Sequence, residues 1–301
     1  MHIDSFNVKL KTLGGKQFWT DIRNCGGWRI QENAVTGHFR LIDSKNYRHC
    51  WGSADECHEF LERKIEAGEA AYPTGRVVIV LHGLIRATGS MQSLGRYLDD
   101  RTTLTALDFE YASTRRPIAE HAAALKSVVD QIGSDVTEIN FVGHSMGNIV
   151  VRRYLHDVKS ATGSSDPRFK RMVMIGPPNQ GSKIARLLSR RLLFKWIAGV
   201  AGQELGAKWD ELEPVLAKPE FEFGIIAGGQ NNHKRFSNFL LPGQDDFTVS
   251  VEETKLSGAT DFLVRPLLHS IMMRHPETLE ATLNYLEHGY FVSSESRQTL
   301  D

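Results

Sequence analysis

From Gly75 onward, short apolar runs rich in β-branched residues alternate with segments of helical periodicity. The apolar runs are continuous, which indicates strands that are buried on both faces. Strands that alternate with helices favour crossover connections and a mostly parallel sheet flanked by helices, that is, an α/β fold. The predicted strands span residues 77–81, 104–109, 138–142, 171–175, 223–227 and 262–266.

Helix and turn signals complete this outline. Ser53 is a suitable N-cap for a helix over 54–66. Pro117 and Pro276 each suit the first turn of a helix, because proline lacks the N–H group that has no partner there. Residues 28–42 are predicted to form two short strands around a turn.

These signals predict three segments of different character. Residues 1–75 are expected to form an N-terminal extension of short strands and one helix, whose function the residues do not indicate. Residues 76–291 are expected to form the α/β core, with a helical cap over about 183–219. Residues 292–301 are expected to form a polar C-terminal tail.

Charge and composition restrict the partners of the chain. Its 301 residues contain 36 basic and 36 acidic side chains, so the net charge is zero and supplies no general attraction to nucleic acid. No apolar run approaches the roughly 20 residues that cross a bilayer. The first residues lack the pattern of a secretory signal, and the cysteines are few, so we expect a cytoplasmic protein. The sequence indicates no oligomeric state.

A zinc site is the alternative that the cysteines raise. His49-Cys50 and Cys57-His58 bring metal-ligating residue types near each other in the sequence. Structural zinc pairs normally have two to four intervening residues, and the predicted helix start at Ser53 separates these pairs. We therefore predict reduced, partly buried cysteines, and neither a metal nor a cofactor.

The strongest chemical signal is Gly-His-Ser-Met-Gly at residues 143–147, directly after a predicted strand and before a helix. This context is the one that a nucleophile elbow requires, because a sharp, strained turn lifts the serine clear of its surroundings. Side chains at Gly143 or Gly147 would crowd that turn. The motif predicts Ser145 as a catalytic nucleophile.

A serine hydroxyl needs a base to activate it and a carboxylate to orient the base. In this architecture the acid and then the histidine follow the serine in the chain. Asp246 is the preferred acid, and Asp245, Glu252 and Glu253 remain alternatives.

His269 is the preferred base, because it follows the last predicted strand in a loop. His288 belongs to the final predicted helix, and His275 precedes Pro276 at the start of that helix. His233 is a further histidine near the acidic segment.

Two backbone N–H groups are expected to bind the negative charge that develops on a substrate carbonyl. The first belongs to Met146, directly after the serine. The second is assigned to Leu84, because His82-Gly83-Leu84 follows the first core strand. For His82 and His144 we expect structural hydrogen bonds.

Taken together, the chain resembles α/β-hydrolases of the bacterial serine lipase and esterase type over about residues 75–288. The resemblance implies the α/β-hydrolase fold and a Ser–Asp–His triad of Ser145, Asp246 and His269. Lipases of this type carry the acid in an Asp-Gly-Thr-Val segment, whereas Phe247 stands at the glycine position here. The motifs that carry the resemblance lie at residues 82–86, 90–91, 111–115, 143–147, 177–182 and 246–254.

The predicted cap favours an apolar substrate. Its apolar residues interleave with the basic residues Arg186, Arg190, Arg191 and Lys195, so it would form either a mobile lid that touches an anionic lipid surface or a permanent wall of an acyl pocket. We therefore expect hydrolysis of a small-molecule ester or lipid. Acyl transfer, thioester or amide cleavage, and non-catalytic binding of a lipid or partner are the alternatives.

Overall fold

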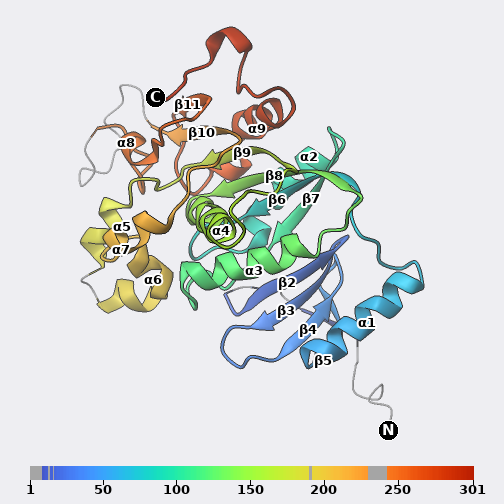
Figure 1. The fold of residues 1–301 in the computed structure, drawn as a ribbon. Helices are drawn as coiled ribbons and strands as arrows, with labels where there is room; N and C mark the ends of the chain where they lie inside the picture. Colours follow the sequence, from blue (N-terminus) through green and yellow to red (C-terminus); the bar gives the residue numbers. More distant parts are fainter. Residues whose placement is uncertain (1–8, 13, 16, 190–191, 230–242) are drawn as a thin grey trace.

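The structure, a computed structural model, describes residues 9–12, 14–15, 17–189, 192–229 and 243–301. These residues form a six-stranded parallel sheet and a five-stranded antiparallel sheet (Figure 1). The parallel sheet has the order β11-β10-β9-β8-β6-β7. All six predicted strands are confirmed: β6 (Gly75–Leu81), β7 (Leu104–Phe109), β8 (Val136–His144), β9 (Phe169–Ile175), β10 (Glu222–Gly228) and β11 (Asp261–Arg265).

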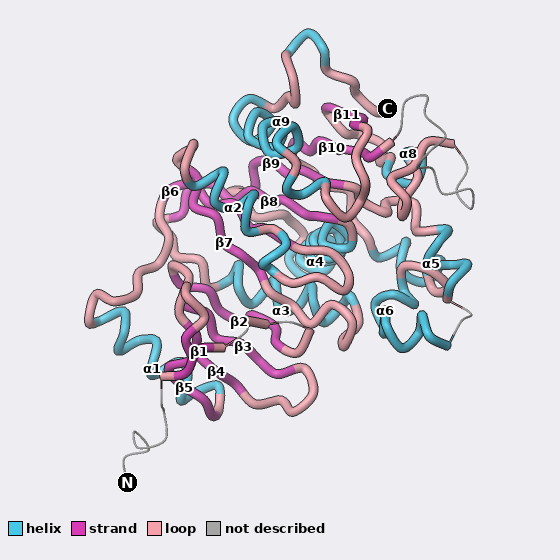
Figure 2. The backbone as a smooth tube through the Cα atoms, turned by 180° about the vertical axis from the view of Figure 1, so that it is seen from behind, coloured by secondary structure: helices cyan, strands magenta, loops and turns pink. Residues whose placement is uncertain are grey.

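Helices cover both faces of the parallel sheet (Figures 1 and 2). Val77 and Ile79 of β6 pack in one buried cluster with α3 and α4, whereas Val78 and Val80 pack in another with α2 and α9. Successive side chains of a strand point to opposite faces, so two covered faces account for a continuous apolar run. The four helices are α2 (Gln92–Asp99), α3 (Ile118–Asp130), α4 (Met146–Thr162) and α9 (Pro276–His288).

The N-terminal extension contains more structure than its sequence indicates. Its sheet has the order β1-β5-β4-β3-β2 and is covered by α1 (Ala54–Glu66), which has the predicted bounds and the predicted Ser53 cap. Cys50 and Cys57 lie in the small core between this sheet and α1. The strands are β1 (Leu10–Lys11), β2 (Trp19–Cys25), β3 (Trp28–Asn33), β4 (Phe39–Ile42) and β5 (Tyr47–Gly52), of which β3 and β4 are the two predicted.

The strand β2 docks this small sheet against the core. The pairing of β2 with β3 shifts register between Asp21 and Arg23, and such irregularities re-aim backbone and side-chain groups. The Ile22 carbonyl accepts hydrogen bonds from Ser127 Oγ on α3 (2.9 Å) and from Nε2 of Gln131, the residue that follows α3 (3.0 Å). The antiparallel sheet is therefore fixed on α3 by side-chain hydrogen bonds to its backbone.

The predicted cap lies between β9 and β10. Gly199 interrupts α6 with φ +63°, and a Cβ there would lie 1.7 Å from the Thr114 carbonyl oxygen. The Glu204 carboxylate at the end of α6 accepts a hydrogen bond from the Ile118 N–H at the start of α3 (2.8 Å). The second half of α6 thus packs closely on the core. The cap helices are α5 (Lys183–Leu188), α6 (Leu192–Glu204) and α7 (Trp209–Leu212), followed by the 3₁₀ turn Glu213–Val215; Arg190 and Arg191 lie outside the described residues.

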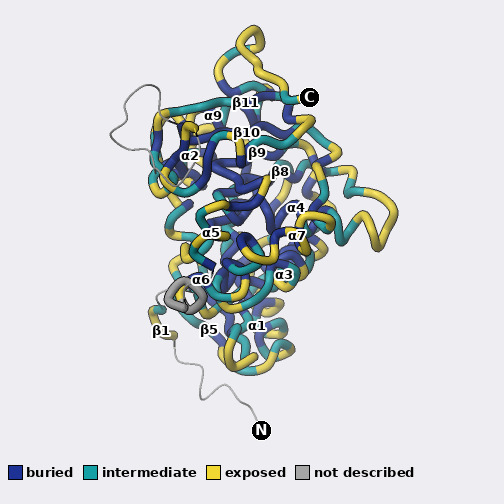
Figure 3. The backbone as a smooth tube through the Cα atoms, turned by 90° about the vertical axis from the view of Figure 1, so that its left-hand side faces the viewer, coloured by how far each residue is buried: buried dark blue, intermediate teal, exposed yellow. Residues whose placement is uncertain are grey.

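The last residues of the chain are tied to the core near β11. The Leu300 N–H donates to the Ala259 carbonyl (3.0 Å), and the Gly258 N–H donates to the Leu300 carbonyl (2.6 Å). Short helical turns complete the structure at α8 (Val251–Thr254), Thr88–Ser90, Met272–Arg274 and Ser294–Ser296. Figure 3 shows that the strands of the parallel sheet are mostly buried, whereas exposed residues gather on the surrounding loops and helices.

Asp21 of β2 makes the stability of the protein depend on pH. Burial raises the pKa of Asp21 to about 6, although the Arg29 charge opposes the shift. Between about pH 4 and 6 the folded protein holds a proton that the unfolded chain has released, so this contribution to stability declines as pH rises. Asp21→Asn removes this titrating group. The free energy of unfolding in urea, taken as variant minus wild type, should therefore rise by about 1 kcal/mol from pH 5.0 to pH 7.5.

The control for this prediction is Asp55→Asn, on the exposed side of α1. Its stability relative to wild type is expected to change by less than half as much between the two pH values. An Asp21→Asn difference that stays the same at both pH values would contradict the prediction.

Candidate active site

Ser145 lies in the sharp turn between β8 and α4, in a backbone conformation that is rare for a residue with a side chain (φ +53°, ψ −123°). The flanking glycines are needed for steric reasons. A Cβ at Gly143 would lie 2.3 Å from Asn148 Oδ1, and one at Gly147 would lie 2.8 Å from the His82 carbonyl oxygen. The turn therefore has the shape that the glycine spacing predicts.

Asp246 and His269 form a hydrogen-bonded pair. His269 Nδ1 lies 2.7 Å from Asp246 Oδ2, and the His269 N–H donates to the Asp246 carbonyl (3.0 Å). Asp246 Oδ1 accepts from the N–H groups of Thr248 (3.0 Å) and Val249 (2.7 Å). One carboxylate oxygen is thus fixed by backbone amides, which leaves the other for the imidazole.

The other acids considered from sequence have different partners. Asp245 Oδ1 accepts from the Phe247 N–H (2.8 Å). Glu253 caps α8 through Ser250 and also accepts from the Lys183 N–H (2.6 Å). Glu252 pairs with Lys255, exposed to solvent. The structure therefore places Asp246 beside His269 and engages these three carboxylates elsewhere.

Two further histidine candidates, His275 and His288, lie at the two ends of α9. His275 precedes α9 as its N-terminal flanking residue, and the ring of His288, at the end of α9, stacks on Tyr290. His233 lies outside the described residues.

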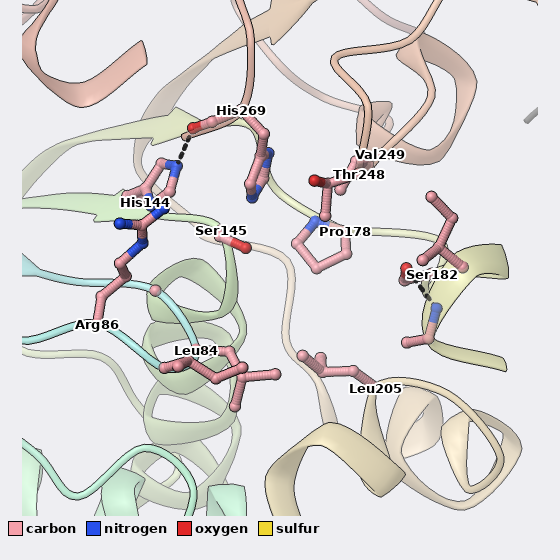
Figure 4. A pocket seen from close by; sticks show the side chains of 14 residues that line it. Leu84, Arg86, His144, Ser145, Pro178, Ser182, Leu205, Thr248, Val249 and His269 are labelled. Carbon is pink, nitrogen blue, oxygen red and sulfur yellow. Dashed lines mark hydrogen bonds between the residues drawn. The ribbon is translucent and has the colours of Figure 1, made fainter. Parts of the chain in front are cut away.

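Ser145 and His269 share a cavity of about 390 Å³ (Figure 4). Its walls are largely apolar and come from the loop after β6, the loop after β9, the cap and the segment that carries Asp246. Among the residues that the structure describes, Arg86 is the one lysine or arginine in the lining. The lining consists of Gly83, Leu84, Ile85, Arg86, His144, Ser145, Pro178, Ser182, Ile184, Ala185, Leu205, Thr248, Val249 and His269.

Two N–H groups beside Ser145 are available to a ligand. Met146 is the first residue of α4, so its N–H has no acceptor within the helix. The Leu84 N–H has no hydrogen-bond acceptor in the part of the chain that the structure describes. The two chain segments approach closely, because a Cβ at Gly83 would lie 3.0 Å from Ser145 Cβ.

The comparisons with known proteins agree with the fold. Residues 74–187 match the model of a protein family described as an alpha/beta hydrolase of unknown function. The six-stranded parallel sheet, its flanking helices and the serine turn after β8 fit that description. The chain has the α/β-hydrolase fold.

Solved structures with this α/β-hydrolase fold include the propeptide form of the Bacillus licheniformis lipase BlEst2, with a TM-score of 0.54 and 16% identity over 76% of this chain and 53% of that one. The phospholipase PlaB of Legionella pneumophila has a TM-score of 0.52 and 17% identity, and the match covers 71% of this chain and 60% of that one. A Listeria innocua gene product has a TM-score of 0.51 and 15% identity, and the match covers 75% of this chain and 99% of that one. The chain thus spans only about half of the lipase propeptide form. No curated protein matches the chain in sequence.

Within the hydrolase fold, His144 supports the segment that carries His269. His144 Nε2 lies 3.0 Å from the His269 carbonyl oxygen. Burial, followed by the nearby His269, holds the pKa of His144 well below its usual value, so the ring is neutral and Nε2 donates to that carbonyl. The expected structural role of His144 is therefore found as a specific contact to the candidate base.

Cys25, Cys50 and Cys57 are buried in the small N-terminal core. The hydrogen bond with Cys50, together with burial, raises the pKa of the Cys57 thiol far above its usual value. Among the residues that the structure describes, no three His, Cys, Asp or Glu side chains are grouped to hold a metal ion. Over the same residues, no helix has the length and hydropathy of a membrane span.

Proposed function

We propose that the protein is a serine hydrolase that cleaves carboxylic esters with an apolar acyl chain. The observation that carries this proposal is the His269–Asp246 hydrogen bond of 2.7 Å at a cavity that also exposes Ser145. The names of the structural neighbours, which include a lipase and a phospholipase, support an ester or lipid substrate.

The reaction follows from the roles that the geometry offers. Ser145 Oγ attacks the ester carbonyl carbon while His269 Nε2 takes the serine proton, and Asp246 stabilises the resulting imidazolium. The N–H groups of Leu84 and Met146 bind the oxyanion. The ester C–O bond then breaks, and His269 returns the proton to the departing alcohol. Water, activated by the same histidine, releases the acid from Ser145.

The cavity supports an apolar acyl group. Leu84, Ile184 and Leu205 contribute apolar walls next to Ser145, and a volume of about 390 Å³ lies in the range of small-molecule sites. Acyl transfer, thioester cleavage and amide cleavage would use the same residues, so competing alcohol, thioester and amide substrates separate these reactions.

Intact-mass analysis after treatment with a fluorophosphonate tests the proposal directly. We expect a single adduct on a serine, mapped by peptide analysis to Ser145, and hydrolysis of 4-nitrophenyl esters within one window of acyl chain length. A folded protein that forms no adduct and hydrolyses no ester, with and without detergent, would refute the proposal and favour a non-catalytic binding protein.

Arg86 is expected to favour substrates with an anionic group near the ester. Its side chain is exposed at the cavity, and its backbone is held by hydrogen bonds from its N–H to Gly83 and from Gln17 to its carbonyl. Arg86→Gln should lower kcat/KM by about 5- to 30-fold for 4-nitrophenyl hydrogen succinate, because a charge-assisted contact is lost, and by less than about 2-fold for 4-nitrophenyl valerate.

The matched control is Arg96→Gln, at an exposed position on α2 that is not part of the cavity lining. It should leave both rates unchanged. If Arg86→Gln lowered kcat/KM equally for the anionic and the neutral ester, Arg86 would not contribute to selectivity for substrate charge.

A further inference from the structure

We infer that the N-terminal extension holds the loop that carries the Leu84 N–H, and that Gln17 is a positioning residue for ester hydrolysis. The loop, residues 82–88, is called the oxyanion loop below. The inference rests on the proposed function, and it gives the extension a role that its sequence does not indicate.

Gln17 connects two loops of the core. Its side-chain oxygen accepts hydrogen bonds from Ser113 Oγ (2.9 Å), the Thr114 N–H (3.1 Å) and Thr114 Oγ1 (3.0 Å). Its side-chain nitrogen donates to the Arg86 carbonyl in the oxyanion loop. One amide therefore joins the loop after β7 to the oxyanion loop, and both of its polar atoms are engaged.

The same contact secures a strained residue next to Leu84. Ile85 has φ +60°, which is a rare and costly conformation for a β-branched residue. Such a conformation persists where its surroundings fix it. The Ile85 N–H donates to Ser113 Oγ (3.1 Å), whose own hydrogen is given to Gln17. Ser113 thus fixes the backbone of Ile85, and Gln17 fixes the backbone of Arg86.

Glu110 contacts both ends of the oxyanion loop and is hydrogen-bonded to one of them, at Thr88. One carboxylate oxygen lies 3.3 Å from His82 Nε2. The other accepts hydrogen bonds from the Thr88 N–H (3.1 Å) and Thr88 Oγ1 (2.8 Å). Glu110 is buried, so these contacts are shielded from water.

The extension in turn holds Glu110. The Glu110 N–H donates to Asp21 Oδ2 (2.7 Å), and the Asp21 N–H donates to the Glu110 carbonyl (2.8 Å). A Cβ at Gly15 would lie 2.1 Å from Glu110 Cγ, so the backbone of the extension lies directly on this side chain. The extension therefore supports the oxyanion loop at Arg86 through Gln17 and at Thr88 through Glu110.

A positioning role of this kind has a kinetic signature. The Leu84 N–H would bind the carbonyl oxygen most strongly when it carries negative charge, that is, in the transition state. A displaced donor therefore lowers kcat and leaves KM nearly unchanged. A general loss of folding would instead reduce the active fraction and the unfolding temperature.

Gln17→Ala in the full chain tests the inference. We expect kcat for 4-nitrophenyl ester hydrolysis to fall by at least 10-fold with KM within 2-fold of wild type. We also expect faster amide hydrogen exchange in peptides that cover residues 82–88. The affinity for a trifluoromethyl ketone should fall with kcat, because this inhibitor forms an oxyanion on the nucleophilic serine.

Gln131→Ala is the matched control. It removes one of the two side-chain hydrogen bonds to the Ile22 carbonyl and so weakens docking of the extension without touching the oxyanion loop. We expect kcat and hydrogen exchange at residues 82–88 to stay within 2-fold of wild type.

The outcomes separate this inference from the proposed function. Unchanged kcat and unchanged exchange in Gln17→Ala, with an active wild type, would overturn the inference alone. Equal effects in Gln17→Ala and Gln131→Ala would also overturn it, since they would indicate loss of docking in general. An inactive wild type would overturn the proposed function, and hydrogen exchange would still decide whether Gln17 holds the loop.

Discussion

Ser145→Ala is expected to lower kcat for ester hydrolysis by about 10⁴- to 10⁶-fold, because the variant has no group that can form the acyl-enzyme. The fold should be unaffected. Ser145 Oγ makes no hydrogen bond within the described part of the chain, and alanine accepts the positive φ of this position no worse than serine does. Initial rates, a fluorophosphonate adduct count and thermal unfolding should be measured together on the purified variant.

Ser182→Ala provides the control from the same cavity. Ser182 lines the pocket, and its hydroxyl accepts a hydrogen bond from the Ala185 N–H at the start of α5. Loss of this cap should cost about 1 kcal/mol of stability and change kcat by only a few fold. A Ser145→Ala protein that keeps more than about 1% of the wild-type rate would exclude Ser145 as the nucleophile.

Asp246→Asn is expected to lower kcat by about 10³- to 10⁴-fold. An asparagine can present an N–H₂ group to His269 Nδ1, which would favour the imidazole tautomer that cannot accept the serine proton. It would also remove the negative charge that stabilises the imidazolium. The substitution is isosteric, so the side-chain oxygen can still accept from the Thr248 and Val249 amides.

Asp245→Asn is the neighbouring control, since Asp245 is equally buried and its side-chain oxygen accepts from the Phe247 N–H. Asparagine can keep that hydrogen bond, and we expect less than a 10-fold change in kcat. The pair should be compared by kcat at pH 8 on one ester. A larger loss in Asp245→Asn than in Asp246→Asn would reverse the assignment of the acid.

Phe247 shows why the sequence left these two aspartates as alternatives. Similar lipase-like segments have glycine at this position, and Phe247 adopts φ +80°, in the region that glycine occupies freely. Its N–H is held by the Asp245 carboxylate. The turn therefore keeps its shape although the glycine is missing. A large side chain in that backbone conformation cannot be predicted from a sequence pattern.

The parallel sheet could be predicted from the sequence because its signal is local. Each strand is a run of apolar residues whose two faces are covered, and the glycines around Ser145 mark a turn that only small residues permit. The nucleophile, acid and base assigned from sequence remain predictions about chemistry. The structure brings Ser145 and His269 to one cavity and places Asp246 within hydrogen-bond distance of His269.

The antiparallel sheet was only partly predictable for the opposite reason. The strand β2 carries the buried polar residues Asp21, Arg23 and Asn24, so it lacks the alternation of apolar and polar residues that indicates a half-buried strand. The contacts of Gln17 are even harder to predict from the sequence, because its partners Arg86 and Ser113 lie 69 and 96 positions away in the chain. Only tertiary structure reveals that these polar groups satisfy one another.

The topology of the two sheets bears on the order in which the protein folds. From β2 to β5 the antiparallel sheet pairs strands that follow one another in the chain, and with α1 it encloses a small core of its own. In the parallel sheet, β6 lies between β7 and β8, so each pairing must first close a long loop. Local pairings form faster than distant ones. The antiparallel sheet is therefore expected to form first, and β7 and α3 are expected to pack against it afterwards.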